Sequence, residues 1–360
     1  MQYIISLIYT IMSLLKKVNI FRRGLMKGIT KNIGESKLIT NGEQINKEEV
    51  KRILITRPNH RLGNQLLITP LIQELTATFP NAKIDLFLKG GVGNILFENY
   101  TQVDQKINLP KKHFKELGKY IGGWFRLKKY NYDIVINVAK NSSSGRLSTK
   151  LANSKYKFFG LDESEFTHKF ENLNHIAKFP VYSFRESISH LGLEPNLSTV
   201  PPLKMMLSKE EIAKGKIDLA KLKEKDAKTI ALFTFATGAK CYSKEWWSTF
   251  YNDLKTTLPD YNIIEVLPVE NVSQLDFSIP HYYSKDVREI CGFFANCDVF
   301  IGADSGIMHL ATASGVPTLG LFSVTQPDTY QPYGNHSKGI NTNTTSNAEI
   351  IQDAKQILEL

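Results

Sequence analysis

The chain has 360 residues, a formal net charge of +10, 42% hydrophobic residues and three cysteines. This length suits two globular domains better than one, and the hydrophobic content is enough for two cores. Three cysteines without ligand spacing exclude a disulfide framework and a cysteine-based zinc site. The sequence contains no nucleic-acid-binding motif, and its basic residues do not recur as a patch on the globular part, so nucleic acid is not expected as a partner.

Residues 1–50 are expected to form a basic amphipathic segment and a linker. Residues 1–15 are uncharged and mostly apolar, and the six lysines and arginines of residues 16–34 stand without any acid. A membrane span needs about 20 apolar residues, and no signal peptide pattern is present. An apolar stretch followed by a basic stretch is typical of a segment lying on an anionic membrane surface. We therefore expect a cytoplasmic protein, peripheral on the inner face of the cytoplasmic membrane; a disordered or locally packed tail is the alternative.

From residue 51 onward, predicted strands and helices alternate. The first series contains strands 52–56, 83–88, 133–138 and 155–159 and helices 63–79, 114–128, 144–151 and 181–191. A proline-rich and charged break follows at 193–228. The second series contains strands 229–235, 261–267, 298–301 and 318–322 and helices 245–257, 287–296, 307–314 and 347–358. Such alternation predicts an α/β fold with two doubly wound, Rossmann-like domains facing a crevice, and ligands at the carboxyl ends of the strands.

Residues 298–334 are the most informative segment. Asp304, Ser305 and Gly306 form a tight turn between a strand and the helix 307–314. Such a turn points backbone N–H groups and the positive end of the helix at one spot, which suits a pyrophosphate. His309 lies one turn into the helix and is able to reach the same anion. An ordinary βαβ unit with a capping serine and a satisfied histidine is the alternative.

The same segment resembles the donor-site signature of glycosyltransferase family 9, the lipopolysaccharide heptosyltransferases. The matching residues are Asp304-Ser305-Gly306, His309-Leu310-Ala311, 315–318 and Pro332-Tyr333-Gly334. The resemblance extends from about residue 52 to residue 334. It implies the two-domain GT-B architecture, with an acceptor-binding domain at 51–205 and a nucleotide-sugar donor-binding domain at 206–346. It also implies that a C-terminal helix at 347–360 can pack back on the first domain.

The resemblance implies transfer of a sugar, with heptose from ADP-heptose as the expected donor, to a lipopolysaccharide core or related cell-surface glycan. The expected partners are a nucleotide diphosphosugar, a lipid-linked saccharide acceptor and an anionic membrane surface. The family's reaction inverts the anomeric centre. No cofactor is expected, and because no D-x-D motif stands where this site would need one, no metal is expected either.

Four residues of the second domain are expected near the donor besides those of the 304–309 turn. Thr237 and Gly238 follow its first strand in a small-residue turn that lets the backbone approach a phosphate. Lys244 aligns with the family's donor-phosphate lysine, and a lysine at a helix start is unfavourable unless an anion is near. Lys240 stands beside the same turn. Glu270 follows the next strand, where the family places ribose and base contacts.

The loop after the first strand is expected on the acceptor side. It contains Arg57, His60, Arg61, Gly63 and Asn64, and Gly63 matches the family's glycine. Arginines suit an anionic acceptor. Asn64 stands where the family carries an aspartate, the suspected general base toward the acceptor hydroxyl; an asparagine cannot serve as a base, although it can orient the acceptor.

Lys140 and Arg146 follow another strand of the first domain and are expected to line the acceptor side of the crevice. A capped helix start is the alternative for this stretch.

Three interpretations of Asn64 stay open. His60 takes the proton, a phosphate oxygen of the donor takes it, or the chain binds without catalysing. The last makes the chain a non-catalytic nucleotide-sugar-binding protein at the membrane. A nicotinamide-dependent oxidoreductase is a third class, which is disfavoured because RPNHRLGN, and not G-x-G-x-x-G, follows the first strand.

Overall fold

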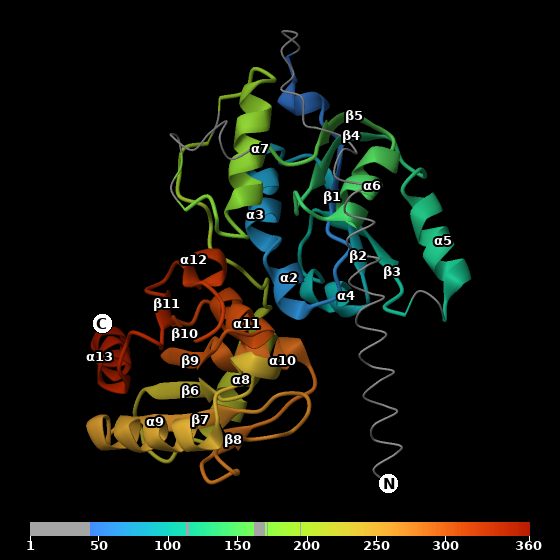
Figure 1. The fold of residues 1–360 in the computed structure, drawn as a ribbon. Coiled ribbons are helices and arrows are strands. Elements are labelled where there is room, and N and C mark those ends of the chain that lie inside the picture. The colour runs from blue at the N-terminus through green and yellow to red at the C-terminus, as the bar shows by residue number, and fades with distance from the viewer. Residues whose placement is uncertain (1–43, 113–114, 162–169, 171, 195) are drawn as a thin grey trace.

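The chain folds into two α/β domains, each built on one parallel sheet (Figure 1). The computed structural model describes residues 44–360 apart from 113–114, 162–169, 171 and 195. The predicted membrane segment at 1–34 therefore lies outside the described residues. Within the described residues, no helix is long and apolar enough to cross a membrane.

The first sheet has the strand order β3-β2-β1-β4-β5. Its strands are β1 (Arg52–Thr56), β2 (Lys83–Lys89), β3 (Val103–Leu109), β4 (Tyr132–Asn137) and β5 (Ser154–Phe158). The helices of this domain are α2 (Leu62–Leu66), α3 (Thr69–Thr78), α4 (Val92–Leu96), α5 (Leu117–Arg126), α6 (Ser143–Leu151) and α7 (Phe179–Ser189), preceded by the short helix η1 (Lys47–Glu49). The order reverses between β1 and β4, so the loop after β1 lies at the switch point where such sheets bind ligands.

The second sheet has the order β11-β10-β9-β6-β7-β8. Its strands are β6 (Thr229–Phe233), β7 (Asn262–Val266), β8 (His281–Tyr282), β9 (Val299–Ala303), β10 (Thr318–Phe322) and β11 (Lys338–Asn341). Its helices are α8 (Lys209–Ala220), η3 (Gly238–Lys240), α9 (Lys244–Thr257), α10 (Val287–Phe294), α11 (Gly306–Ser314), α12 (Pro327–Tyr330) and α13 (Asn347–Leu358). The switch point between β6 and β9 places the loops after both strands at one edge of the sheet.

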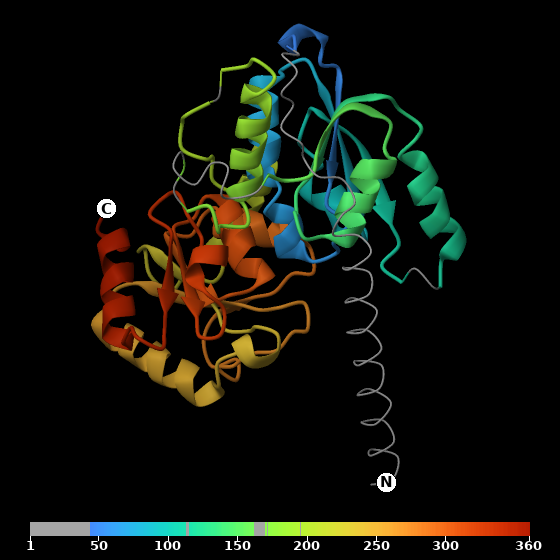
Figure 2. The same cartoon turned by 45° about the horizontal axis from the view of Figure 1, so that its top comes forward.

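One apolar cluster runs through both domains. It contains Leu66 of α2 and Leu71 of α3 together with Met308 and Leu310 of α11, all buried. Helix α2 packs on α11, so the two domains share a core at the place where their switch points meet. Figure 2 shows α2 and α11 side by side between the two sheets.

The structure corrects the prediction of one helix at 63–79. The chain forms α2 and α3 with a break between them, because Pro70 has no N–H to donate to the Leu66 carbonyl. The Thr69 hydroxyl donates to that carbonyl instead, at 2.8 Å.

The predicted position of the C-terminal helix on the first domain is wrong. Helix α13 packs against α9 and β9 of the second domain, where Ile350, Ile351 and Ala354 are buried in its core (Figure 1). The linker prediction for residues 35–50 also fails at its described end. Ile45 and Val50 are buried, and the Ile45 N–H donates to the Leu191 carbonyl at 2.9 Å.

Candidate active site

The loop after β1 and the turn after β9 meet at the junction of the two domains. A β-carbon on Gly63 would stand 2.7 Å from Cδ2 of His309 and 3.3 Å from Cα of Gly306. A β-carbon on Gly306 would in turn lie 3.3 Å from the Gly63 nitrogen. A side chain at position 63 would therefore force the His309 ring to move, and one at position 306 would tighten the packing of α2 on α11. The structure thus brings the predicted acceptor residue Gly63 onto the predicted donor residues Gly306 and His309.

Helix α11 begins at this junction. The Ser305 side chain accepts a hydrogen bond from the Met308 N–H at 3.2 Å, and the helix ends at Gly315, which has a φ of 92°. The first-turn N–H groups and the positive helix end favour negative charge next to Ser305 and Gly306. This is the geometry predicted from the sequence.

Asp304 connects the β9 turn to two neighbouring loops. Its Oδ2 accepts from Lys240 Nζ at 2.5 Å and from the Thr325 hydroxyl at 2.5 Å, and its carboxylate is buried. Asp304 therefore positions a cation at the start of α11. Sequence reasoning missed Thr325, which lies in the loop after β10 and carries no motif of its own.

The structure places Lys240, and not Lys244, beside Asp304. Lys244 opens α9 and forms an ion pair with Asp276 at the surface, where both side chains are about half exposed or more. The sequence predicted a donor phosphate as the partner of Lys244, but in the structure the Asp276 carboxylate takes that place. Lys240, the last residue of η3, is the lysine that reaches the domain junction.

The other three predicted donor residues differ in their placement. Thr237 precedes η3, and Gly238 begins it with a φ of 67°, with no atom within 4 Å of the position its β-carbon would take. This turn is open to a ligand on the side of Lys240. Glu270 is exposed in the turn after β7, and among the described residues the Asp304 carboxylate bonds to Lys240 and Thr325 and not to this turn.

His309 is a buried, neutral imidazole. Burial lowers its pKa to about 4, with Lys240 and His175 acting in the same direction and Asp304 acting against them. A neutral histidine next to a diphosphate can donate a hydrogen bond without carrying charge. His309 therefore remains suited to the donor role that its sequence position predicts.

Arg57 is a buried cation at the same junction. Its Nη2 donates to Oδ1 of Asn64 at 2.8 Å, and among the described residues no carboxylate forms an ion pair with it. Burial lowers the pKa of Arg57, and Tyr330 of the second domain acts against this shift. A buried guanidinium without an anionic partner is costly unless a ligand supplies one.

Tyr330 of α12 connects this arginine to the donor side. Its ring centroid lies 5.9 Å from Lys240 Nζ, and its phenol is close enough to Arg57 to affect the pKa of the guanidinium. Arg57 from the first domain and Lys240 from the second therefore flank one tyrosine. The two cations lie at the domain junction, where α11 begins. Two cations together with the N-terminus of a helix are suited to bind a dianionic group such as a diphosphate.

His60 and Arg61 lie at the outer end of the β1 loop, and both are exposed. Burial lowers the pKa of His60, and Lys111, Lys89 and Arg61 lower it further. The imidazole is therefore mainly neutral at pH 7 and can accept a proton. The role of His60 as a base stays a prediction.

Lys140 and Arg146 lie at the neighbouring strand end, after β4. Ser142 caps α6 by accepting from the Gly145 N–H at 3.2 Å, as the alternative in the sequence analysis anticipated. Arg146 is buried, its Nη1 donates to the Lys140 carbonyl at 3.3 Å, and its guanidinium lies 5.6 Å from the Phe159 ring centroid. Both residues share the ligand edge of the first sheet with Arg57.

A second histidine at the domain junction was not predicted. His175 Nδ1 accepts from the Ala177 N–H at 3.2 Å, so Nε2 must donate to the Gln331 carbonyl at 2.8 Å. Burial lowers its pKa to about 4. Its ring packs edge-on against Tyr333, at 5.0 Å between centroids. The Pro332-Tyr333-Gly334 motif that His175 contacts was recognised in the sequence. His175 itself was missed because it lies in the part of the chain where the family resemblance is thin.

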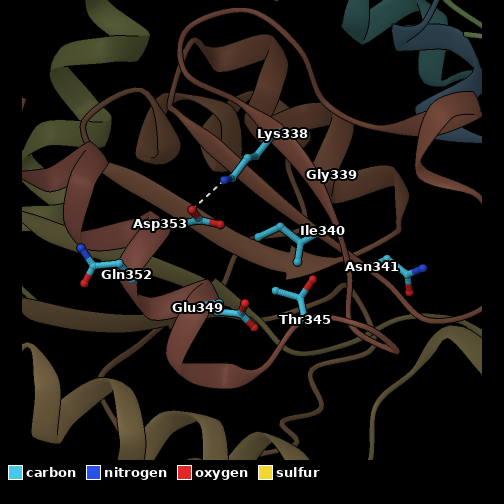
Figure 3. Close-up of a pocket in the computed structure, with 8 residues that line it drawn as sticks. All are labelled: Lys338, Gly339, Ile340, Asn341, Thr345, Glu349, Gln352 and Asp353. Atoms are coloured by element: carbon cyan, nitrogen blue, oxygen red, sulfur yellow. Dashed lines mark ion pairs between the residues drawn. The ribbon is translucent and has the colours of Figure 1, made fainter.

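A pocket of about 420 Å³ lies elsewhere, between β11 and α13 (Figure 3). Its charged side chains are already partnered: Lys338 pairs with Asp353 at 2.6 Å, and Glu349 accepts from the Ser346 hydroxyl at 2.7 Å. No predicted site residue lines it. Within the described residues, no group of three or more His, Cys, Asp or Glu side chains is arranged to hold a metal.

The chain is similar to known glycosyltransferases. Residues 286–357, which include Asp304 and His309, match the model of glycosyltransferase family 9 (heptosyltransferase). Lipopolysaccharide heptosyltransferase 3 of Escherichia coli (strain K12) is 24% identical over 301 residues, which are 75% of this chain and 82% of that protein.

Two solved structures share the fold over nearly their whole length. A family 9 glycosyl transferase from Veillonella parvula DSM 2008 has a TM-score of 0.64 at 18% identity, covering 87% of this chain and 99% of the other. The E. coli heptosyltransferase WaaC, solved with ADP-2-deoxy-2-fluoro heptose, has a TM-score of 0.58 at 15% identity, covering 86% and 99%. The fold is thus that of the GT-B glycosyltransferases. The family match over residues 286–357 and the E. coli relative indicate a glycosyltransferase that is similar to the heptosyltransferases of family 9.

Proposed function

We propose that this glycosyltransferase transfers heptose from ADP-heptose to a hydroxyl of a lipopolysaccharide core or related cell-surface glycan. The observation that carries the proposal is the meeting of Arg57, Lys240 and the N-terminus of α11 around the Gly63–His309 contact. Arg57 is buried without a carboxylate partner among the described residues, so the junction calls for an anionic ligand. The similarity to WaaC, solved with an ADP-heptose analogue, supports the choice of donor.

The donor's diphosphate would lie against the α11 N-terminus. As the bond between the anomeric carbon and the diphosphate oxygen breaks, its electron pair passes to that oxygen and negative charge grows there. Lys240, held by Asp304, and the first N–H groups of α11 would stabilise this charge without rearranging. His309 would add a neutral hydrogen-bond donor.

The acceptor hydroxyl would attack the anomeric carbon from the opposite face, which inverts its configuration. Asn64 cannot take the hydroxyl proton, but because its Oδ1 accepts from Arg57, its NH₂ group would be the part of the side chain that donates to the acceptor oxygen. His60, kept mainly neutral by its surroundings, would receive the proton. In the proposed reaction the anomeric carbon forms a bond to the acceptor oxygen and loses its bond to the diphosphate oxygen. ADP leaves, and the hydroxyl proton passes to the His60 imidazole.

The acceptor is proposed to be lipid-linked, and residues 1–34 are proposed to hold the protein on the anionic inner face of the cytoplasmic membrane. The support is their sequence, in which an apolar stretch precedes six basic residues. Exposed Arg61 and the half-buried Lys140 offer positive charge to an anionic acceptor.

The test is incubation of the full chain with ADP-heptose and a core oligosaccharide, with and without EDTA. The proposal expects ADP release and a heptosylated product of inverted configuration, by mass spectrometry and NMR, in both samples. Donor binding without any product would instead favour the non-catalytic nucleotide-sugar-binding protein, which the asparagine at position 64 suggests. Dependence on added metal would contradict the metal-independent mechanism.

A further inference from the structure

Helix α5 carries a row of exposed apolar side chains. Leu117, Ile121 and Phe125 are 56%, 46% and 71% exposed, and they follow one another at intervals of four residues. This spacing puts all three on one side of the helix. Most exposed apolar residues of a protein stand singly, so a row of three on one helix calls for an explanation.

The opposite side of α5 is firmly attached to the first domain. The Trp124 ring packs edge-on against Phe87 at 5.2 Å between centroids, and Gly123 lies so close to Leu109 that a β-carbon there would be 2.7 Å from its side chain. Tyr120 and Trp124 complete this inner face, which belongs to the core around β2 and β3. The exposed row is therefore the outer face of a packed helix and not the inner face of a detached one.

The surroundings of α5 are strongly basic. The described residues between 111 and 129 contain one acid, Glu116, and seven cations: Lys111, Lys112, Lys115, Lys119, Arg126, Lys128 and Lys129. The expectation that basic residues do not recur as a patch on the globular part is wrong at this helix. Apolar side chains next to cations are the composition of a helix that lies in the interface of an anionic bilayer.

The position of α5 fits a role in approaching the acceptor. Figures 1 and 2 show it on the outside of the first domain, next to the β3 edge of the sheet. The segment that joins β3 to α5 begins at the ligand edge, where Gly90 N–H donates to the Leu109 carbonyl at 2.7 Å. Lys111 of this segment lies close enough to His60 to act on its charge. A surface on which α5 rests would thus lie next to the outer end of the β1 loop.

We propose that the outer face of α5 docks on the anionic lipid surface, with Leu117, Ile121 and Phe125 in the interface and the flanking cations on the headgroups. This second contact, independent of residues 1–34, would orient the β1 loop toward a lipid-linked acceptor. Charge complementarity favours anionic lipid over a second copy of this chain, which carries a net charge of +10. The orientation of the acceptor rests on the proposed function, whereas the docking itself does not.

The test places an environment-sensitive fluorophore on the helix of the full chain. Cys291 and Cys297 are buried and Cys241 is half-buried, so a Cys241→Ser background with Phe125→Cys labels one site. Val269→Cys, 60% exposed in the second domain, is the matched control. With vesicles of phosphatidylethanolamine and phosphatidylglycerol, the label at 125 should shift to blue emission and be quenched by brominated lipid, and the label at 269 should not.

Other outcomes would overturn the proposal. If the protein sediments with vesicles while the label at 125 keeps its aqueous emission, residues 1–34 alone make the contact. A blue shift without vesicles would mean that protein covers the helix: another copy if the shift depends on concentration, or the chain's own N-terminal segment if it does not. An equal shift with phosphatidylcholine vesicles would contradict the role of the cations.

Two variants measure the contributions separately. Lys119→Gln with Arg126→Gln should weaken binding to the anionic vesicles about fivefold for each charge removed. Leu117→Ser with Ile121→Ser should weaken it at least about tenfold. ADP-heptose binding should be unchanged in both variants, so a loss of docking with intact donor binding separates this proposal from the proposed function. Unchanged vesicle affinity in both variants would contradict it.

Discussion

Gly63 of the first domain lies against the imidazole of His309 of the second, so closely that a methyl group on Gly63 would stand 2.7 Å from Cδ2 of the ring. The contact joins the start of α2 to the first turns of α11. Arg57, Lys240 and the α11 N-terminus surround it. This contact lies at the centre of the candidate site, and the predictions below test its role.

Replacing Gly63 with alanine should push α2 away from α11. A displacement of about 1 Å in a site that depends on orientation lowers turnover by about 100-fold, and single-turnover transfer with a soluble acceptor would measure it. Gly118→Ala is the control, because no atom lies within 4 Å of its β-carbon position and it stands on α5. Equal transfer rates in Gly63→Ala and Gly118→Ala would mean that the Gly63–His309 contact is not needed for transfer.

The two candidate lysines can be separated by calorimetry. Lys240→Ala should weaken binding of ADP by about 10- to 150-fold, or about 1.5–3 kcal/mol, because it removes a hydrogen bond to a charged group. Lys244→Ala removes only a surface ion pair with Asp276 and should leave the affinity nearly unchanged. A larger loss of ADP affinity in Lys244→Ala than in Lys240→Ala would instead support Lys244 as the phosphate-binding lysine, as the family resemblance implies.

The proton acceptor can be identified from His60 and Asn64. If His60 is the base, His60→Ala should lose about 10²–10⁴-fold in turnover. Because the pKa of His60 is lowered from its usual value, the wild-type rate should fall only under acidic conditions, where the imidazole becomes protonated. Asn64→Asp should change turnover modestly or raise it. A nearly silent His60→Ala with a pH-independent wild-type rate would assign the proton to a donor phosphate oxygen instead.

Stability should depend on pH through the two buried histidines. Burial lowers the pKa of His175 and of His309 from 6.5 to about 4, so the unfolded chain binds protons between these values that the folded chain does not. The free energy of unfolding should therefore decrease as the pH falls from 6.5 toward 4, by at most about 3 kcal/mol for each histidine. Urea titrations of wild type and His175→Gln should show a smaller pH dependence in the variant. An identical dependence would mean that His175 is not neutral in the folded protein.

The order of strands and helices was largely readable from the sequence, because apolar periodicity reports burial within each element. Among the elements that the sequence analysis did not predict, β3 and α8 were missed for one reason, which is that few of their residues are buried and apolar. Strand β3 is mostly polar, with only Val103, Ile107 and Leu109 buried, since it lies at the sheet edge. Helix α8 is mostly charged and buries only Gly215 and Leu219.

The site was readable in part. The Asp304–Ser305–Gly306 turn and His309 were found because backbone geometry and helix capping are local properties. The sequence did not favour Lys240 over Lys244. The short helix η3 brings Lys240 to Asp304, and a helix of three residues has no apolar periodicity from which it could be predicted. The pairing of Gly63 with His309 depends on how the domains dock, which no local pattern records.

The claim that this junction transfers sugar is tested most directly by one single-turnover measurement. The full chain, in excess over labelled ADP-heptose, is mixed with a core oligosaccharide acceptor, and label in the acceptor is followed over time. We predict that the wild type moves the label to the acceptor and that Lys240→Ala, at donor concentrations that restore binding, moves it more slowly. A wild-type chain that binds ADP-heptose but leaves all label in the donor would contradict the account.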